Sequence, residues 1–126
     1  CERCGMKTVF LLAPTTPEER VKHIAQCATG FIYYVSRTGV TGVRDNLASD
    51  LGEMVAMIKR HSDKPLVVGF GIHNRDQVRA VAELADGVVV GSAIVNTIKD
   101  NLGDDSAMLN RMGELVTDLV EGTKLG

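Results

Sequence analysis

The sequence contains no tryptophan and few aromatic residues of any kind. Aromatic side chains make up 4% of its 126 residues. Stacking of bases or sugars on aromatic rings is therefore not expected to dominate ligand binding. Charge of one sign is also scarce, because 14 Lys and Arg residues are balanced by 16 Asp and Glu residues, for a formal net charge of −2. Without a basic cluster to neutralise phosphates, a dedicated nucleic-acid surface is not expected.

Long apolar runs are also missing. No run approaches the ~20 residues that span a bilayer, so neither a membrane span nor a secretory signal is expected. Cysteine is limited to three residues, a usage that fits a reducing cytoplasm. Cys1 and Cys4 form a C-x-x-C, but no second Cys/His pair has matching spacing, so no metal site is predicted. Cys27 falls in a helical pattern and is predicted to be a small buried hydrophobe.

The start of the chain predicts a fragment. It opens on Cys1 instead of methionine, and residues 1–5 are typical of the tail of a helix whose beginning is absent. No linker, charge block or low-complexity segment interrupts residues 1–126, which predicts a single piece of one domain.

Apolar strands alternate with helical patterns along the whole chain. Thr16 is a predicted N-cap, with Pro17 in the first turn and Glu19 completing a capping box, and Gly30 is predicted to end that helix. A glycine-containing loop is predicted over 36–46. Strands are predicted over 9–13, 31–35, 66–69 and 88–90, and helices over 16–30, 51–58, 74–85, 92–101 and 109–120.

This alternation predicts an α/β fold with a parallel sheet covered on both faces. Four βα units are half of a (β/α)8 TIM barrel, and a small doubly wound sheet is the competing architecture. The extra short helix directly after the last strand favours the barrel. Half a barrel leaves two edge strands unpaired and exposes an apolar patch, which invites a partner or a homodimer. The strand valines considered for that patch are Val9, Val35, Val68 and Val90.

Two glycine turns predict a phosphate site. The letters GFGI at 69–72 follow one apolar strand, and GSAI at 91–94 follow the next. A glycine at the mouth of a strand lets the backbone approach a ligand closely. A helix beginning just beyond presents free N–H groups and the positive end of its dipole. Two such turns side by side are expected to hold a phosphate.

No acid–base pair accompanies this predicted site. The strand ends read APTT, VSRTG, GFGI and GSAI, and none carries Asp, Glu or Lys. His73 follows GFGI, but beside Asn74 it is predicted to help start a helix and not to act as a catalyst. Asp45 and Asp50 follow the loop and fit solvated or capping roles.

Four strings in this order resemble the C-terminal half of the tryptophan synthase alpha subunit family: FLLAPTTPEER, YYVSRTGVTGVRDN, VVGFGI and GVVVGSAIV. The resemblance covers essentially the whole chain. It implies strands five to eight of a TIM barrel. It also implies a carbon–carbon lyase of tryptophan biosynthesis, which cleaves indole-3-glycerol phosphate to indole and glyceraldehyde 3-phosphate. No cofactor is implied for this chain, because pyridoxal phosphate belongs to the partner beta subunit of an expected alpha2beta2 complex.

The resemblance also implies roles for particular residues. The phosphate would lie against backbone N–H groups near Gly71, Gly91 and Ser92, with the Ser92 hydroxyl as a further donor. Tyr33 is expected to face the substrate, with Tyr34 on the opposite side of the strand packing against helices. The remaining implied substrate contacts are Gly42, near the phosphate, and Phe70.

The loop over 36–46 resembles the mobile lid of the family. Gly39 and Gly42 would give it hinge freedom, Thr41 would hydrogen-bond a catalytic aspartate on closure, and Arg37 would stabilise the lid or approach the phosphate. The catalytic Glu and Asp are expected upstream of Cys1. No catalytic residue is therefore predicted in this chain, and the chain alone is predicted to be inactive.

Two other functions remain open at this point. One is a different phosphate-binding barrel enzyme, such as a thiamine phosphate synthase or a phosphosugar isomerase, although the SRTGVTG lid speaks against it. The other is a non-catalytic half-barrel that pairs with itself and merely binds phosphate.

Overall fold

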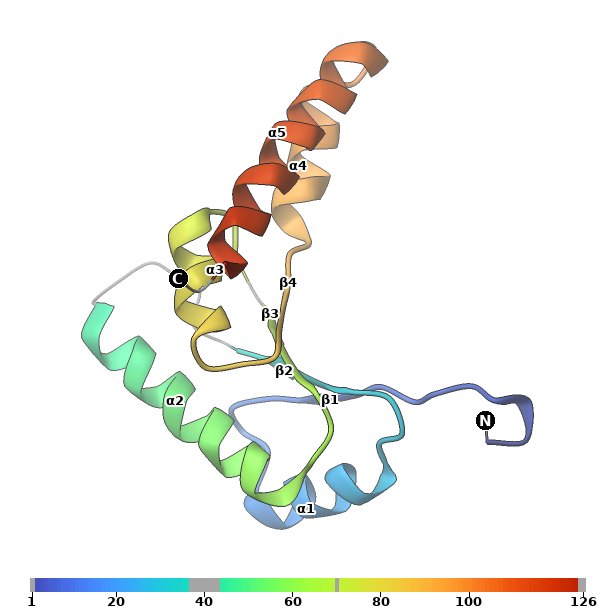
Figure 1. Ribbon diagram of the computed structural model, residues 1–126, viewed down its shortest axis with the longest axis vertical. Helices are drawn as coiled ribbons and strands as arrows, with labels where there is room; N and C mark the ends of the chain where they lie inside the picture. The colour runs from blue at the N-terminus through green and yellow to red at the C-terminus, as the bar shows by residue number, and fades with distance from the viewer. Residues whose placement is uncertain (1, 37–43, 70, 125–126) are drawn as a thin grey trace.

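The structure is a computed structural model, and it describes residues 2–36, 44–69 and 71–124 (Figure 1). A short 3-10 turn at Glu2–Cys4 precedes the first strand. The strands are β1 (Phe10–Leu12), β2 (Ile32–Val35), β3 (Leu66–Gly69) and β4 (Gly87–Val89). The helices are α1 (Glu18–Cys27), α2 (Arg44–His61), α3 (Arg75–Ala82), α4 (Ser92–Asp100) and α5 (Asp105–Thr123).

All the strands are parallel, and their order in the sheet is their order in the chain, β1-β2-β3-β4. The ladders bring Leu12 beside Tyr34, Tyr34 beside Val68 and Val68 beside Val88. Parallel neighbours joined by crossing helices are the repeating unit of a barrel, and the predicted αβ alternation is confirmed.

One face of the sheet carries the core. Leu12, Ile32, Tyr34, Leu66 and Val68 are each at most 4% exposed. They pack with buried side chains of α1, α2, α3 and α5. Burial alternates along β2 because successive side chains point to opposite faces.

The other face is not covered by helices of the described chain, contrary to the two-sided cover expected from the apolar strands. Leu11 is 61% exposed there, and Tyr33, Val35 and Val67, which share its parity, are only half-buried. Val68, named as a candidate for this patch, instead faces the helices. A sheet with helices on one side is what part of a barrel wall requires, since the inner face is filled only when the barrel closes.

The last two helices form a pair. Figure 1 shows α4 and α5 projecting together from the sheet, with the turn between them at the far tip. α5 packs on α3 through Leu119 and Gly122, which are both buried. No residue of α4 is buried.

Two helix boundaries differ from the sequence-based expectation. The N-cap of α1 is Pro17, without a side-chain cap, because the Thr16 hydroxyl accepts the Ala13 N–H at 3.0 Å instead. Glu19 pairs with Lys22 at 2.7 Å, so the predicted capping box is wrong. α1 ends at Cys27, three residues before Gly30. The Gly30 N–H donates to the Thr8 carbonyl, and a Cβ there would lie 2.9 Å from that oxygen.

Two further expectations are corrected. α2 begins at Arg44, inside the segment expected to be loop, because a polar N-terminal turn gives no apolar periodicity to detect. Cys27 is exposed, since it lies on the face of α1 opposite Val21 and Ala25. Among the described residues, no helix combines the length and apolar character needed to cross a membrane.

Candidate functional site at the strand carboxyl ends

The two predicted phosphate turns lie at neighbouring strand ends. Gly69 of β3 is the register partner of Val89 of β4, so Gly71 and Gly91 each follow that pair by two residues. Gly71 has φ of +66°, a left-handed backbone that L side chains rarely adopt, which explains why glycine stands there. The carboxyl ends of parallel strands are where barrel sites form.

The start of α4 has open backbone donors. Gly91 is its N-cap, with no side-chain cap hydrogen bond. By contrast, α3 and α5 are capped by Asn74 and Asp104, whose side chains accept from Gln77 and Ala107. The first N–H groups of a helix have no partner inside the helix. A Cβ added at Gly91 would meet nothing within 4 Å, so packing within the described chain does not demand glycine there. This leaves free space over the N-terminus of α4, beside the exposed Ser92.

His73 takes part in the turn before α3. Its Nδ1 lies 2.8 Å from the Gly71 carbonyl, and its N–H donates to the Gln77 side chain at 2.9 Å. Gln77 in turn donates its N–H to Asn74 Oδ1 at 3.0 Å. These reciprocal bonds satisfy the first donors of α3, as in a capping box. The predicted role of His73 and Asn74 in starting this helix is confirmed.

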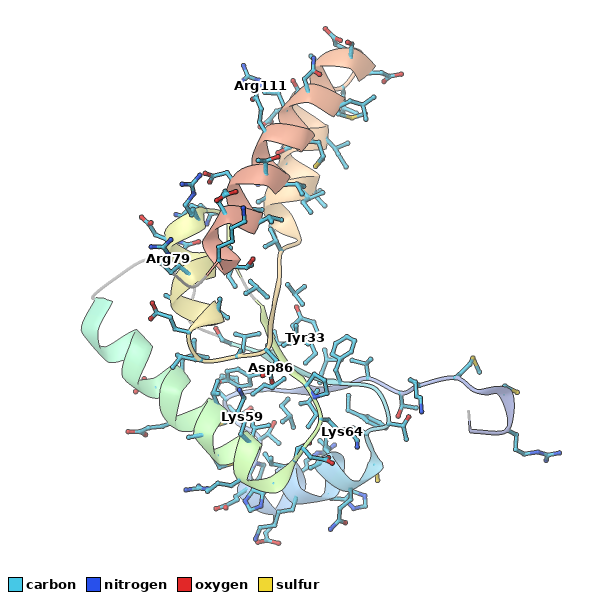
Figure 2. The ribbon with its side chains drawn as sticks, viewed as in Figure 1. Tyr33, Lys59, Lys64, Arg79, Asp86 and Arg111 are labelled. Atoms are coloured by element: carbon cyan, nitrogen blue, oxygen red, sulfur yellow. The ribbon has the colours of Figure 1, made fainter. Side chains whose placement is uncertain are left out.

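Tyr33 lies on the open face of the sheet, while Tyr34 is 4% exposed among the helices, as predicted. The Tyr33 hydroxyl is 2.8 Å from where a Cβ of Gly69 would be. The ring therefore reaches across β3 toward the strand ends, and Figure 2 shows it beside the central strands. Gly69 makes this approach possible. Sequence reasoning missed this role, although the strand-terminal glycine of VVGFGI was its signal.

Burial raises the pKa of Tyr34 above its usual range, with a smaller contribution from Asp50. At the opposite end of the sheet, Asp86 accepts the Leu66 N–H at 2.9 Å and lies 3.2 Å from Lys59 Nζ. The Leu66 hydrogen bond, followed by Lys59, holds the pKa of Asp86 below its usual range against the opposing effect of burial. Asp86 precedes β4, so it braces the amino end of the sheet and takes no part in the turns.

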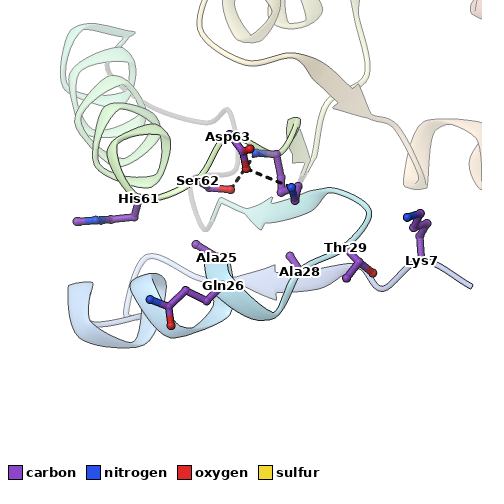
Figure 3. A pocket seen from close by; sticks show the side chains of 9 residues that line it. Lys7, Ala25, Gln26, Ala28, Thr29, His61, Ser62 and Asp63 are labelled. Carbon is purple, nitrogen blue, oxygen red and sulfur yellow. Dashed lines mark hydrogen bonds and ion pairs between the residues drawn. The ribbon is translucent and has the colours of Figure 1, made fainter. Parts of the chain in front are cut away.

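A cavity of about 510 Å³ also lies away from these turns (Figure 3). Ala28, Thr29, Ser62 and Lys64, which follow α1 and α2 and precede β2 and β3, contribute to its lining. Three of its ionic lining groups are already in pairs, His61 with Glu18 at 2.6 Å and Lys64 with Asp63 at 3.2 Å. It is at the amino end of the strands and is not a candidate for the predicted site.

Several predicted site residues fall outside the described ranges. These are the lid residues Arg37, Gly39 and Thr41, together with Gly42 and Phe70. Cys1 of the C-x-x-C is also outside them, and Cys4 is exposed and free. Within the residues that the structure describes, no group of three or more His, Cys, Asp or Glu side chains could hold a metal ion.

Comparison with known proteins gives a consistent family. A family model described as tryptophan synthase alpha chain matches residues 1–124. The tryptophan synthase alpha chain of Opitutus terrae is 56% identical over 124 residues, which are 98% of this chain and 47% of the relative. That of Methanocaldococcus jannaschii is 44% identical over 105 residues, 83% of this chain and 37% of the relative.

Solved structures agree. One of Mycobacterium tuberculosis tryptophan synthase superposes with a TM-score of 0.82 at 35% identity, covering 99% of this chain and 45% of that one. The tryptophan synthase A-subunit of Pyrococcus furiosus gives 0.78 at 36% identity, covering 95% and 47%. These neighbours are TIM barrels, of which this chain covers less than half. The chain thus spans less than half the length of the relatives it matches, and it belongs to the tryptophan synthase alpha chain family.

Proposed function

We propose that this chain is the phosphate-binding half of an alpha subunit that cleaves indole-3-glycerol phosphate to indole and glyceraldehyde 3-phosphate. The observation that carries the proposal is the start of α4, where Gly91 leaves the helix N-terminus open and without a side-chain cap. Such an end attracts a phosphate through its N–H groups and its dipole. The family match favours this function over another phosphate-binding barrel enzyme or a non-catalytic half-barrel.

In this proposal the residues of the chain bind and orient the substrate. Backbone N–H groups at Gly71, Gly91 and Ser92 hold the phosphate, with the Ser92 hydroxyl as a further donor. Tyr33, reaching across Gly69, forms part of the wall beside the rest of the substrate, together with Phe70. Closure of a lid containing Arg37, Gly39, Thr41 and Gly42 excludes water from the site.

The proton-transfer groups come from elsewhere. Cleavage needs a proton delivered to the indole ring carbon, removal of the indole N–H proton, and a base on the glycerol hydroxyl. No carboxylate stands at the carboxyl end of any predicted strand of this sequence, and His73 is held by the Gly71 carbonyl and by Gln77. The acid and base therefore belong to the part of the alpha subunit outside this chain, and the chain alone is inactive.

The same proposal extends to partners. Indole passes to a beta subunit in an alpha2beta2 complex, and pyridoxal phosphate belongs to that subunit, with no cofactor on this chain. The segment from Pro14 to Thr16 is the proposed contact. The Thr16 N–H donates to the Ala13 carbonyl at 2.9 Å, and the Thr16 hydroxyl accepts the Ala13 N–H, so the segment is held in a fixed turn. A cytoplasmic location follows from the sparse cysteine.

Ser92→Ala tests the phosphate site. The loss of one hydrogen bond to a charged group is expected to weaken glycerol phosphate binding by about 1–2 kcal/mol, measured by calorimetry. Ser106→Ala is the matched control, because Ser106 lies in the first turn of α5, whose end is capped by Asp104. Unchanged affinity in Ser92→Ala would remove this hydroxyl from the site.

Activity is tested by reconstitution. The remaining part of the Opitutus terrae alpha chain, produced separately, is mixed with this chain, and indole release from indole-3-glycerol phosphate is measured. We expect turnover only from the mixture, and less of it with Ser92→Ala. Turnover by this chain alone would contradict the placement of the acid and base outside it, and His73→Ala would then be the first variant to make.

A further inference from the structure

The turn that follows β3 is held in place from two sides. Ile72 is 6% exposed and belongs to the hydrophobic core. On the outside, Nδ1 of the exposed His73 lies 2.8 Å from the Gly71 carbonyl oxygen. Because a carbonyl oxygen only accepts hydrogen bonds, His73 donates this one through Nδ1–H. The turn is therefore anchored by a buried apolar side chain and by an imidazole ring.

Gly71 needs such an anchor because of its backbone conformation. Its φ of +66° is one of several conformations that glycine adopts at similar cost, so contacts outside the residue must select it. The hydrogen bond from His73 fixes the Gly71 carbonyl group, and the planar peptide unit that contains this carbonyl is fixed with it. Rotation about the Gly71 backbone is thereby restricted, and its N–H is presented in one direction.

The imidazole ring is not needed to start α3. The Asn74 side chain accepts the Gln77 N–H at 3.0 Å, and the Gln77 side chain accepts the backbone N–H of His73 at 2.9 Å. Neither hydrogen bond uses an atom of the His73 ring, so both would remain if the ring were removed. The ring therefore acts on the turn before the helix, while the helix start is satisfied by other groups.

The neighbouring turn shows what a fixed Gly71 serves. Gly71 and Gly91 each lie two residues beyond a register pair, Gly69 of β3 and Val89 of β4. A phosphate bound between these turns needs N–H groups from two separate segments to converge on it. A donor that is already oriented loses less conformational entropy when the ligand binds, which increases affinity.

We propose that His73 is a positioning residue for phosphate binding, whose ring holds the Gly71 carbonyl and so orients the Gly71 N–H toward a phosphate at the start of α4. The inference rests on the proposed phosphate site and adds to it a residue that acts through Gly71. The hydrogen bonds that carry it all lie within residues 71–77, so they do not depend on how the rest of the barrel is completed.

Calorimetry with glycerol phosphate tests the proposal on three variants of His73. His73→Ala removes the ring donor and should raise the dissociation constant about three- to tenfold. His73→Asn should restore most of the affinity, because the N–H of an asparagine amide is as many bonds from the backbone as Nδ1–H of histidine. His73→Gln carries its amide one bond farther out and should bind as weakly as His73→Ala.

Asn74→Ala separates positioning of the turn from stability of the helix. It removes the side-chain cap of α3 and leaves the contact between His73 and Gly71 in place. It should lower the midpoint of thermal unfolding at least as much as His73→Ala and leave the affinity for glycerol phosphate nearly unchanged. Equal losses of affinity in Asn74→Ala and His73→Ala would overturn the proposal, because the ring would then act only through the stability of α3.

The tautomer of the ring gives a readout that needs neither phosphate nor a variant. The hydrogen bond made by one ring nitrogen sets which nitrogen carries the proton in neutral histidine. Long-range 1H–15N correlation spectra at mildly alkaline pH should therefore show the proton of His73 on Nδ1. A neutral ring with its proton on Nε2 would overturn the proposal, since Nδ1 would then have no hydrogen to donate to Gly71.

The binding measurements also separate this inference from the proposed function. If Ser92→Ala weakens binding and His73→Ala does not, the phosphate site stands and the role of His73 is wrong. Equal losses in His73→Ala and His73→Asn would also contradict that role, because the asparagine keeps the donor. If the unchanged chain does not bind glycerol phosphate at all, the proposed function and this inference both fail.

Discussion

At the scale of single residues, some glycines are required because a Cβ would collide with neighbouring atoms, whereas others stand where a Cβ would fit. In α5, a Cβ at Gly122 would lie 2.7 Å from the Arg75 carbonyl and 2.9 Å from Val78 Cβ. At Gly113, nine residues earlier in the same helix, it would meet nothing within 4 Å. The close packing of α5 on α3 is therefore set at one glycine and not at the other.

Gly113→Ala should raise the free energy of unfolding by about 0.5–1 kcal/mol, because alanine restricts the unfolded chain and favours helix. Gly122→Ala should lower it by about 1–3 kcal/mol, since the backbone of α3 must move. Urea unfolding of both variants measures this difference. Equal effects of the two substitutions would contradict the packing of α5 on α3.

The open face of the sheet provides a second residue-scale prediction. A Cβ at Gly87 would lie 2.6 Å from Val67 Cγ1, while every other atom near it is at least 3.8 Å away. Gly87→Ala should therefore destabilise the fold by about 1–2 kcal/mol, and Val67→Ala should remove most of that cost in a double-mutant cycle.

Gly69 supplies the contrast for this cycle. A Cβ there would approach Val89 Cβ at 2.8 Å and the Val89 carbonyl oxygen at 2.9 Å. Because that oxygen belongs to the backbone, Val89→Ala should not rescue Gly69→Ala. If the valine substitution restores stability in both double-mutant cycles, or in neither, then side-chain crowding does not explain why glycine is needed at these two positions.

At the scale of elements, Asp86 joins the amino ends of β3 and β4 and the end of α2. Its pKa is lowered, so the stability it contributes is present above its ordinary pKa of 3.8 and is lost as pH falls through the lower value of the folded state. Asp86→Asn should reduce stability at neutral pH and flatten the loss between mildly and strongly acidic pH. Thermal unfolding across that range measures both effects. Asp63→Asn is the control and should change little, because its carboxylate is 90% exposed beside Lys64.

The elements themselves were largely predictable from the sequence. Apolar runs predicted every strand to within two residues at either end, because a strand buried on a parallel sheet needs little more than β-branched residues in a row. Helix starts were less predictable. Asn74 caps α3 as expected, whereas Thr16 does not cap α1, since its hydroxyl has the nearby Ala13 N–H as a competing partner.

The candidate site was predictable only as a backbone motif. The GFGI and GSAI turns indicated where N–H groups gather, and the register places these turns at neighbouring strand ends. The close approach of Tyr33 to Gly69 was not predictable, because it depends on a side chain that reaches the neighbouring strand. The register between two strands cannot be derived from the local sequence of either one.

At the scale of the whole molecule, one face of the sheet is uncovered in this chain but would face the interior of a closed barrel. Some substitutions on that face should therefore leave the folding of this chain unchanged and prevent the barrel from closing. Leu11→Lys replaces a residue 61% exposed, so circular dichroism and thermal unfolding of this chain should change little. The interior of a small barrel is filled by side chains, so a charge there should prevent closure with the rest of an alpha chain.

Reconstituted indole release measures this closure for Leu11→Lys. Met6→Lys, at a site 57% exposed before β1, is the control and should leave the reconstituted activity unchanged. Closure that tolerates Leu11→Lys would show that this face of the sheet is not the barrel interior.

Because sheet order equals chain order, each strand meets its partner soon after it is made. The register pairs Phe10 with Ile32, Ile32 with Leu66, and Val67 with Gly87. Each of these contacts closes a short loop, which keeps the entropic barrier to pairing low. On the ribosome, each newly emerged unit is therefore expected to dock on the one before it, and the three ladders form without waiting for a distant part of the chain.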